Sequence, residues 1–179
     1  MAKLADVLSA IDALGFDPRR SKVVATRLRD AGVIPAGGPA RSPDLDETDT
    51  LRLIVAIAVT SKLRLADHDL DVYAGLVPFG LVFREGTPDS IPRTAFDAID
   101  LLVETARAGD TDARLSTIEF VRSWPEIVVN RYPNIWIRHF VVAGSNAGHW
   151  QRSGHRTATT VPVRVIADIL DQVFGKVAA

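Results

Sequence analysis

The sequence predicts an α+β fold, in which an N-terminal helical helix-turn-helix unit precedes a small antiparallel sheet flanked by helices. Apolar residues recur at helical spacing early in the chain, whereas after residue 113 the apolar segments are β-branched and aromatic. The 179 residues, of which 47% are apolar, suffice for a packed core. We divide the chain into a helix-turn-helix unit (1–76), a connector with a packing helix (77–112), and the sheet with a C-terminal helix (113–179).

The first two predicted helices give the outline of a helix-turn-helix. Apolar residues recur at helical spacing over 4–14, and Gly15 ends that helix. Asp17 and Pro18 begin a second helix, since proline is tolerated at the first helical position, and Gly32 ends it. Two short helices joined by a brief turn that contains glycine are typical of this motif.

The second helix has an apolar side and a basic side. At 100° per residue, Val24, Leu28 and Ala31 cluster opposite a stripe of basic residues and one threonine. A DNA-recognition helix needs an apolar back and exposed donors for phosphates and base edges, although ordinary surface helices with a solvated basic side share this pattern. Both interpretations stay open. The candidate DNA contacts are Arg19, Arg20, Lys22, Thr26, Arg27 and Arg29.

A segment rich in proline and glycine over 34–43 follows the second helix and cannot continue it. This segment either lies along a DNA backbone and presents Arg41, or it is a linker. Asp46 then begins a third helix with an acidic cap, and residues 51–59 are apolar nearly all round. We expect that helix to be the buried centre of the unit, with a further helix over 69–76.

The run from Val24 to Pro39 (VATRLRDAGVIPAGGP), with the acidic cap and apolar helix after it, resembles an N-terminal module of phage- and prophage-type DNA-binding proteins of proteobacteria. In that group a helix ending in Leu-Arg-(Glu/Asp)-Ala-Gly-(Leu/Val)-(Leu/Ile)-Pro leads into a Gly-rich basic loop. The resemblance covers residues 4–76, under half of the chain. It implies DNA recognition in a phage-like context, by a regulator or a packaging factor.

The rest of the chain predicts a sheet closed by a helix. After a connector over 77–92 and a packing helix, strands are predicted over 115–121, 127–129 and 135–142. A last helix with an apolar stripe begins near Pro162, and we expect this stripe to pack on the sheet.

The predicted loop over 144–156 is rich in glycine and basic residues and contains no acid. Three interpretations stay open. The loop is a nucleic-acid arm with Arg152 and Arg156 on phosphates, a contact in an oligomer anchored by Trp150, or a surface loop whose tryptophan folds back on the sheet.

The net charge of −1 hides an uneven distribution of charge along the chain. Between positions 17 and 42 six basic residues face only Asp17 and Asp30, and no acid occurs over 127–167. Since phosphate binding depends on a local basic face, a neutral average does not exclude DNA as a partner.

Signatures of catalysis are sparse. The chain has no cysteine, and it lacks Gly-x-Ser-x-Gly, a phosphate-binding loop and a dinucleotide-binding glycine motif. His149 and His155 are too loosely placed for a metal site, and the acidic residues of 67–71 are more typical of helix capping. We expect no enzymatic activity, no cofactor and no metal.

These observations favour a sequence-selective DNA-binding protein that recognises double-stranded DNA as a transcriptional regulator or DNA-packaging factor. The C-terminal part is then expected to mediate homo-oligomerisation or partner contact. The alternative is a protein-interaction or structural module of a phage-like assembly that binds no DNA. No segment is long and apolar enough to cross a membrane, since the run 51–59 contains Arg52, and no signal peptide is recognisable. We therefore expect a cytoplasmic protein.

Overall fold

The computed structural model describes residues 1–38, 42–83, 92–133, 136–146 and 154–177, and it confirms the predicted α+β class. The described residues form seven α-helices, a five-stranded antiparallel sheet and a two-stranded sheet. The helices are α1 (Leu4–Ala13), α2 (Pro18–Asp30), α3 (Glu47–Val59), α4 (Ala66–Ala74), α5 (Ala95–Arg107), α6 (Thr111–Leu115) and α7 (Val163–Phe174), with a 3-10 helix η1 (Leu63–Leu65) before α4. The strands are β1 (Ala2–Lys3), β2 (Asp44–Leu45), β3 (Val77–Pro78), β4 (Thr117–Val121), β5 (Glu126–Arg131), β6 (Trp136–Val141) and β7 (Ala158–Pro162).

The N-terminal helices begin where side chains satisfy their free amides. The Asp17 carboxylate accepts a hydrogen bond from the Arg19 amide at 2.9 Å, directly before Pro18 at the start of α2. Asp46 and Asp49 form a reciprocal capping box at the start of α3. Helix α3 is buried along nearly its whole length, as its apolar composition predicts, and α2, α4 and α7 pack against it.

The large sheet has the strand order β3-β6-β5-β4-β7, and every neighbouring pair is antiparallel. The predicted strands correspond to β4, β5 and β6. The edge strands β3 and β7 were not predicted, because β3 has only two residues and β7 gains its regular structure from pairing with β4. Alternation along the strands places one row of side chains in the core: Ile118, Phe120, Ile127, Val129 and Phe140.

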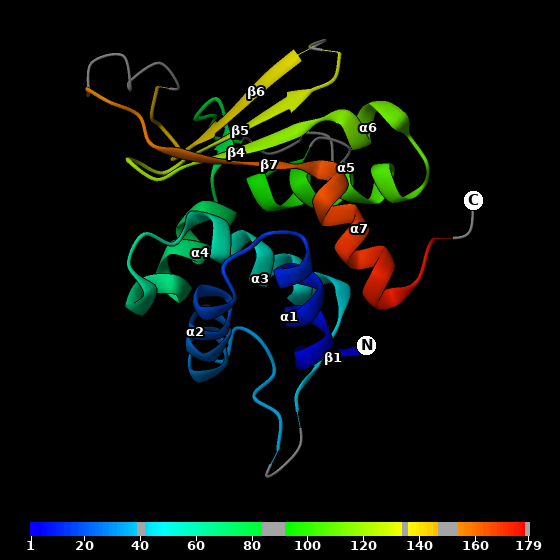
Figure 1. The fold of residues 1–179 in the computed structure, drawn as a ribbon. Helices are drawn as coiled ribbons and strands as arrows, with labels where there is room; N and C mark the ends of the chain where they lie inside the picture. The colour runs from blue at the N-terminus through cyan, green and yellow to red at the C-terminus, as the bar shows by residue number, and fades with distance from the viewer. Residues whose placement is uncertain (39–41, 84–91, 134–135, 147–153, 178–179) are drawn as a thin grey trace.

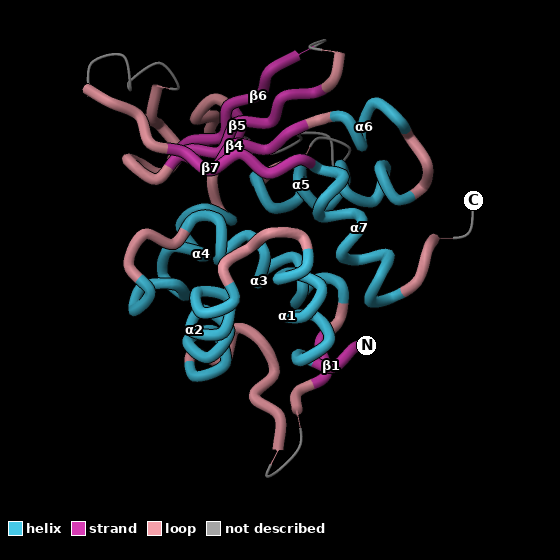
Figure 2. The backbone as a smooth tube through the Cα atoms, in the orientation of Figure 1, coloured by secondary structure: helices cyan, strands magenta, loops and turns pink. Residues whose placement is uncertain are grey.

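The helices α1 to α5 and α7 lie below the five-stranded sheet in Figure 1, and Figure 2 shows the strands of this sheet as a separate layer, with β1 beside α1 in the helical layer. Helix α7 packs mainly on α5, α1, α6 and α3 and only weakly on β7, so its apolar stripe meets helices more than the sheet that the sequence predicted. Val7, Ile99 and Ile118, one from each predicted segment, belong to the same core cluster. The core is therefore continuous across all three segments.

Candidate nucleic-acid interface

Helix α2 lies at the surface, and the predicted apolar side is buried except for Ala31, which follows the last residue of the helix and is exposed. Val24, Ala25 and Leu28 are fully buried against the rest of the helical layer. Arg19, Lys22 and Thr26 are exposed, one turn of helix apart from one another. The Thr26 hydroxyl donates to the Lys22 carbonyl oxygen at 3.0 Å, which leaves its lone pairs facing solvent.

The Arg20 side chain binds the end of α3 and is not part of the exposed stripe. Its Nε donates to the Ile57 carbonyl at 3.1 Å, and its Nη2 donates to the Thr60 carbonyl. These carbonyls belong to the end of α3, where the last acceptors of a helix lack partners within it. Burial, together with the nearby charge of Arg122, lowers the pKa of Arg20. We therefore remove Arg20 from the candidate DNA contacts.

Two further arginines of the predicted stripe are not freely exposed: Arg27 is bound to a carboxylate, and Arg29 is half-buried. Arg27 donates from Nε and Nη2 to the two carboxylate oxygens of Asp67, each at 2.9 Å, and this hydrogen bonding raises its pKa. Arg29 is half-buried beside Leu4, Ala5 and the segment around Pro43. The helical periodicity placed these residues near the basic side, but their neighbours come from other elements.

The structure adds cations that the sequence did not single out. Lys62 and Arg64, on and beside η1, are exposed, and Arg64 lines a hollow of about 410 Å³ together with Lys22 and Thr26. Residues 31–62 separate α2 from η1 in the chain, so only the basic composition of 62–64 could have indicated this contribution. We define the α2–η1 surface by its exposed donors: Arg19, Lys22, Thr26, Lys62 and Arg64.

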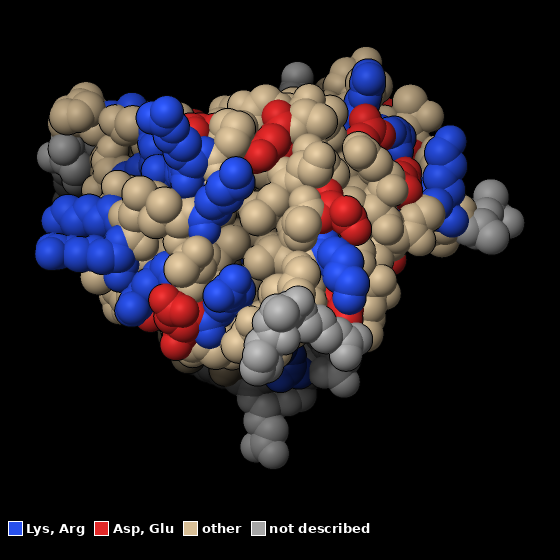
Figure 3. Space-filling model, turned by 60° about the horizontal axis from the view of Figure 1, so that its bottom comes forward, with Lys and Arg blue, Asp and Glu red and all other residues tan. Residues whose placement is uncertain are grey.

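The four cations of the α2–η1 surface form no ion pair with any of the residues that the structure describes. Figure 3 shows Lys and Arg gathered at the left, the side on which α2 and α4 lie in Figure 1, whereas positive and negative side chains mix on the right. The protein thus has a local basic surface although its net charge is close to zero.

Four candidate residues remain: Arg41, Trp150, Arg152 and Arg156. Arg41, Trp150 and Arg152 lie outside the described residues. Arg156 is described, and it pairs on the sheet with the Glu119 carboxylate, while its Nε lies 3.8 Å from Glu126 Oε2. We therefore assign Arg156 to a network of side chains on the sheet.

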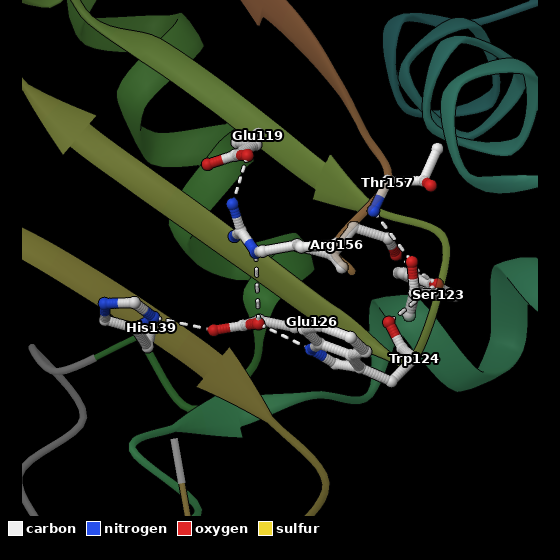
Figure 4. A network of polar contacts seen from close by, with 9 residues as sticks. Glu119, Ser123, Trp124, Glu126, His139, Arg156 and Thr157 are labelled. Atoms are coloured by element: carbon white, nitrogen blue, oxygen red, sulfur yellow. Dashed lines mark hydrogen bonds and ion pairs between the residues drawn. The ribbon is translucent and has the colours of Figure 1, made fainter. Parts of the chain in front are cut away.

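Glu126 is the centre of that network (Figure 4). Its carboxylate is fully buried, accepts a hydrogen bond from Trp124 Nε1 at 2.7 Å, and lies 2.7 Å from His139 Nδ1. A buried carboxylate that orients an imidazole is one component of acid–base catalysis. Within the described part of the chain, no serine or threonine hydroxyl hydrogen-bonds to His139.

No group of three or more His, Cys, Asp or Glu among the described residues is arranged to hold a metal ion. No described helix is long and apolar enough to cross a membrane. In comparisons with known proteins, no protein-family model, no curated protein and no solved structure matches this chain.

Proposed function

We propose that this protein binds double-stranded DNA with sequence selectivity through the α2–η1 surface, as a transcriptional regulator or as a recognition factor in phage-like DNA packaging. The observation that carries the proposal is the set of exposed donors on α2 and η1, whose cations have no carboxylate partner among the described residues. Lys22 and Arg64 outnumber Asp30, the one described carboxylate that lines the hollow with them, so phosphates approach a surface of net positive charge.

The dimensions of α2 suit the major groove. Thr26 lies seven positions after Arg19, which is about 10 Å along a helix axis, or about three base pairs. An α-helix fits the major groove, where a bidentate arginine reads guanine and a threonine hydroxyl reads several bases. Arg64 lines the hollow with Lys22 and Thr26, and Lys62 directly precedes η1; there the two cations would hold phosphates and fix the register.

A triple variant tests the proposal. Replacement of Arg19, Lys22 and Arg64 by alanine is expected to abolish DNA binding and to leave the melting temperature nearly unchanged, because all three are exposed. Binding is measured with genomic fragments at two salt concentrations, and wild-type affinity is expected to fall steeply at the higher one.

A matched control removes the same charge elsewhere: Lys3, Arg164 and Lys176 are exposed and lie outside the α2–η1 surface. This control is expected to retain most of the DNA affinity. Equal affinity for the wild type and the Arg19/Lys22/Arg64 variant would contradict the proposal.

An exposed apolar patch favours self-association as a second property of the same protein. Phe79, Leu81 and Val82 are 50%, 53% and 72% exposed, and Val142 lies beside them because Gly144 donates to the Gly80 carbonyl. Apolar side chains grouped in this way are typical of protein contacts. We propose that the patch joins copies of the chain.

The mass in solution tests this association. A Val82→Asp variant is expected to reduce the mass to that of a monomer. An oligomer that forms through the patch while the wild type binds no DNA would favour the alternative function, a structural module of an assembly.

A further inference from the structure

We infer that the DNA contact continues from the α2–η1 surface onto the β4–β5 turn, where Arg122, with Ser61 and His68, holds a backbone phosphate that flanks the recognised base pairs. This inference rests on the proposed function and deepens it, because it assigns a second, non-helical element to the same partner. It also separates two roles: α2 reads sequence, and the turn fixes the position of the duplex.

A hollow of about 220 Å³ separates the α3–α4 corner from the β4–β5 turn. Ser61, His68 and Asp69 line it from the corner, and Arg122 and Ser123 line it from the turn. Apolar and aromatic side chains complete its wall: Val59, Val72, Tyr73, Trp124 and Pro125. Its rim therefore carries several donors from two elements that are distant in sequence.

The β4–β5 turn is held rigidly, so that Arg122 projects from a fixed backbone. The Tyr73 hydroxyl donates to the Val121 carbonyl and lies 3.2 Å from the Trp124 carbonyl, one on each side of Arg122. The Arg122 amide donates to the Thr157 carbonyl at 2.8 Å, and the Thr157 amide donates to Ser123 Oγ at 2.7 Å. A binding side chain on a fixed element loses less conformational entropy when it binds.

The hollow adjoins the α2–η1 surface through Arg20. That side chain reaches from α2 to the Thr60 carbonyl, and Ser61 and Lys62 follow directly in the chain. The charge of Arg122 is near enough to Arg20 to contribute to the lowering of its pKa. The basic surface thus runs from α2 through the α3–α4 corner to the turn.

The balance of charge in the hollow favours an anion. Arg122 is exposed and forms no ion pair within the described residues. The one carboxylate that lines the hollow, Asp69, accepts a hydrogen bond from the Ser61 amide at 3.3 Å, which is part of the corner itself. Within the lining Arg122 balances Asp69, and the excess of positive charge comes from Arg20 and Lys62, which lie beside the hollow on either side of the Thr60–Ser61 link. A phosphodiester matches this excess and can accept hydrogen bonds from Ser61 and His68.

The experiment compares Arg122→Ala with the wild type on a selected DNA fragment and on a scrambled fragment, over a series of salt concentrations. Loss of one phosphate contact is expected to weaken binding to both fragments by the same factor, roughly fivefold to tenfold, and to reduce the slope of log K against log salt by about 0.9. The ratio of the two affinities should stay unchanged, since a phosphate contact carries no sequence information. His68→Gln is expected to act in the same direction, with a smaller effect.

Arg164→Ala, which removes an exposed arginine from α7, is the matched control and should alter neither slope nor ratio. An Arg122→Ala variant with wild-type affinity and slope would overturn the inference and leave the proposed function intact. A changed ratio would overturn the assignment of Arg122 to the backbone, and the absence of DNA binding by the wild type would overturn both proposals.

Discussion

The guanidinium of Arg107 and the carboxylate of Asp171 form an ion pair, with Nε 2.9 Å from Oδ1, that joins the end of α5 to α7. Nη1 of the same side chain donates to Glu47 at the start of α3, and Nη2 donates to the Gly175 carbonyl at 2.9 Å. Only 3% of the Arg107 side chain is exposed. One buried arginine thus connects three helices and closes the end of the last one.

We predict that Arg107→Met destabilises the protein by about 3 kcal/mol, because it leaves the largely buried carboxylate of Asp171 without its closest partner. Glu47 is half-exposed, so water compensates for most of its loss. The free energy of unfolding, measured in urea, checks this expectation. As a control, Arg164→Ala breaks only an exposed pair with Asp168 and should change the free energy of unfolding by less than about 0.5 kcal/mol. Equal effects for the two variants would contradict the prediction.

Tyr73 connects the helical layer to the sheet through its hydrogen bond to Val121, and burial raises the pKa of its phenol above the usual value. Above a pH of about 10 the unfolded chain loses this proton more readily than the folded chain does. The contribution of Tyr73 to the free energy of unfolding is therefore complete below that pH, and it falls as the pH rises beyond it. We predict that Tyr73→Phe costs about 1–2 kcal/mol at neutral pH and reduces the alkaline loss of stability.

Absorbance at 295 nm provides the direct measurement for Tyr73. The chain has two tyrosines, so in a Tyr132→Phe background the signal of tyrosinate comes from Tyr73 alone. We expect no tyrosinate signal until the pH at which circular dichroism reports unfolding. Ionisation of Tyr73 in the folded protein near its usual pKa would disprove the prediction.

The buried carboxylate of Glu126 leads to a third prediction. Glu126→Ala leaves Trp124 Nε1 and His139 Nδ1 without their shared acceptor and is expected to cost about 3 kcal/mol. Glu119→Ala, which removes a more exposed carboxylate from the same network, should cost about 1 kcal/mol. Urea denaturation measures both, and an upfield shift of the Trp124 indole proton should report the lost hydrogen bond. A Glu126→Ala protein as stable as the wild type would show that the network contributes nothing to folding.

Local patterns in the sequence predicted the elements that are determined locally. An apolar run with an acidic cap predicts the buried helix α3, and β-branched segments predict β4 to β6. Strand β7 was missed because its sequence, ATTVP, gains its regular structure from pairing with β4. Helix α6 has five residues, too few for a helical period to be recognised.

The candidate interface was only partly predictable for a different reason. Periodicity gives the side of α2 on which Arg20 and Arg27 lie, but their partners are at least 37 residues away in the chain. Whether an arginine is available to DNA depends on such partners, and the helical periodicity of the sequence gives no information about them. The same limit applies to Lys62 and Arg64, because their position beside α2 results from the packing of α3 and α4.

The ion pair between Arg27 and Asp67 gives the last prediction, which concerns DNA affinity. The hydrogen bond from Arg27 lowers the pKa of Asp67, so this carboxylate stays charged and the pair persists at neutral and mildly acidic pH. Asp67→Asn is expected to release the Arg27 guanidinium beside Lys22 and to strengthen DNA binding at low salt by roughly threefold to tenfold. The slope of log K against log salt should become steeper by about 0.9.

The control is Asp71→Asn, which changes the net charge equally at an exposed position on the same helix and should have a much smaller effect on DNA affinity. Titration of both variants with one DNA fragment separates the release of Arg27 from a general change in charge. Equal gains for the two variants would mean that Arg27 does not contact DNA even when it is freed.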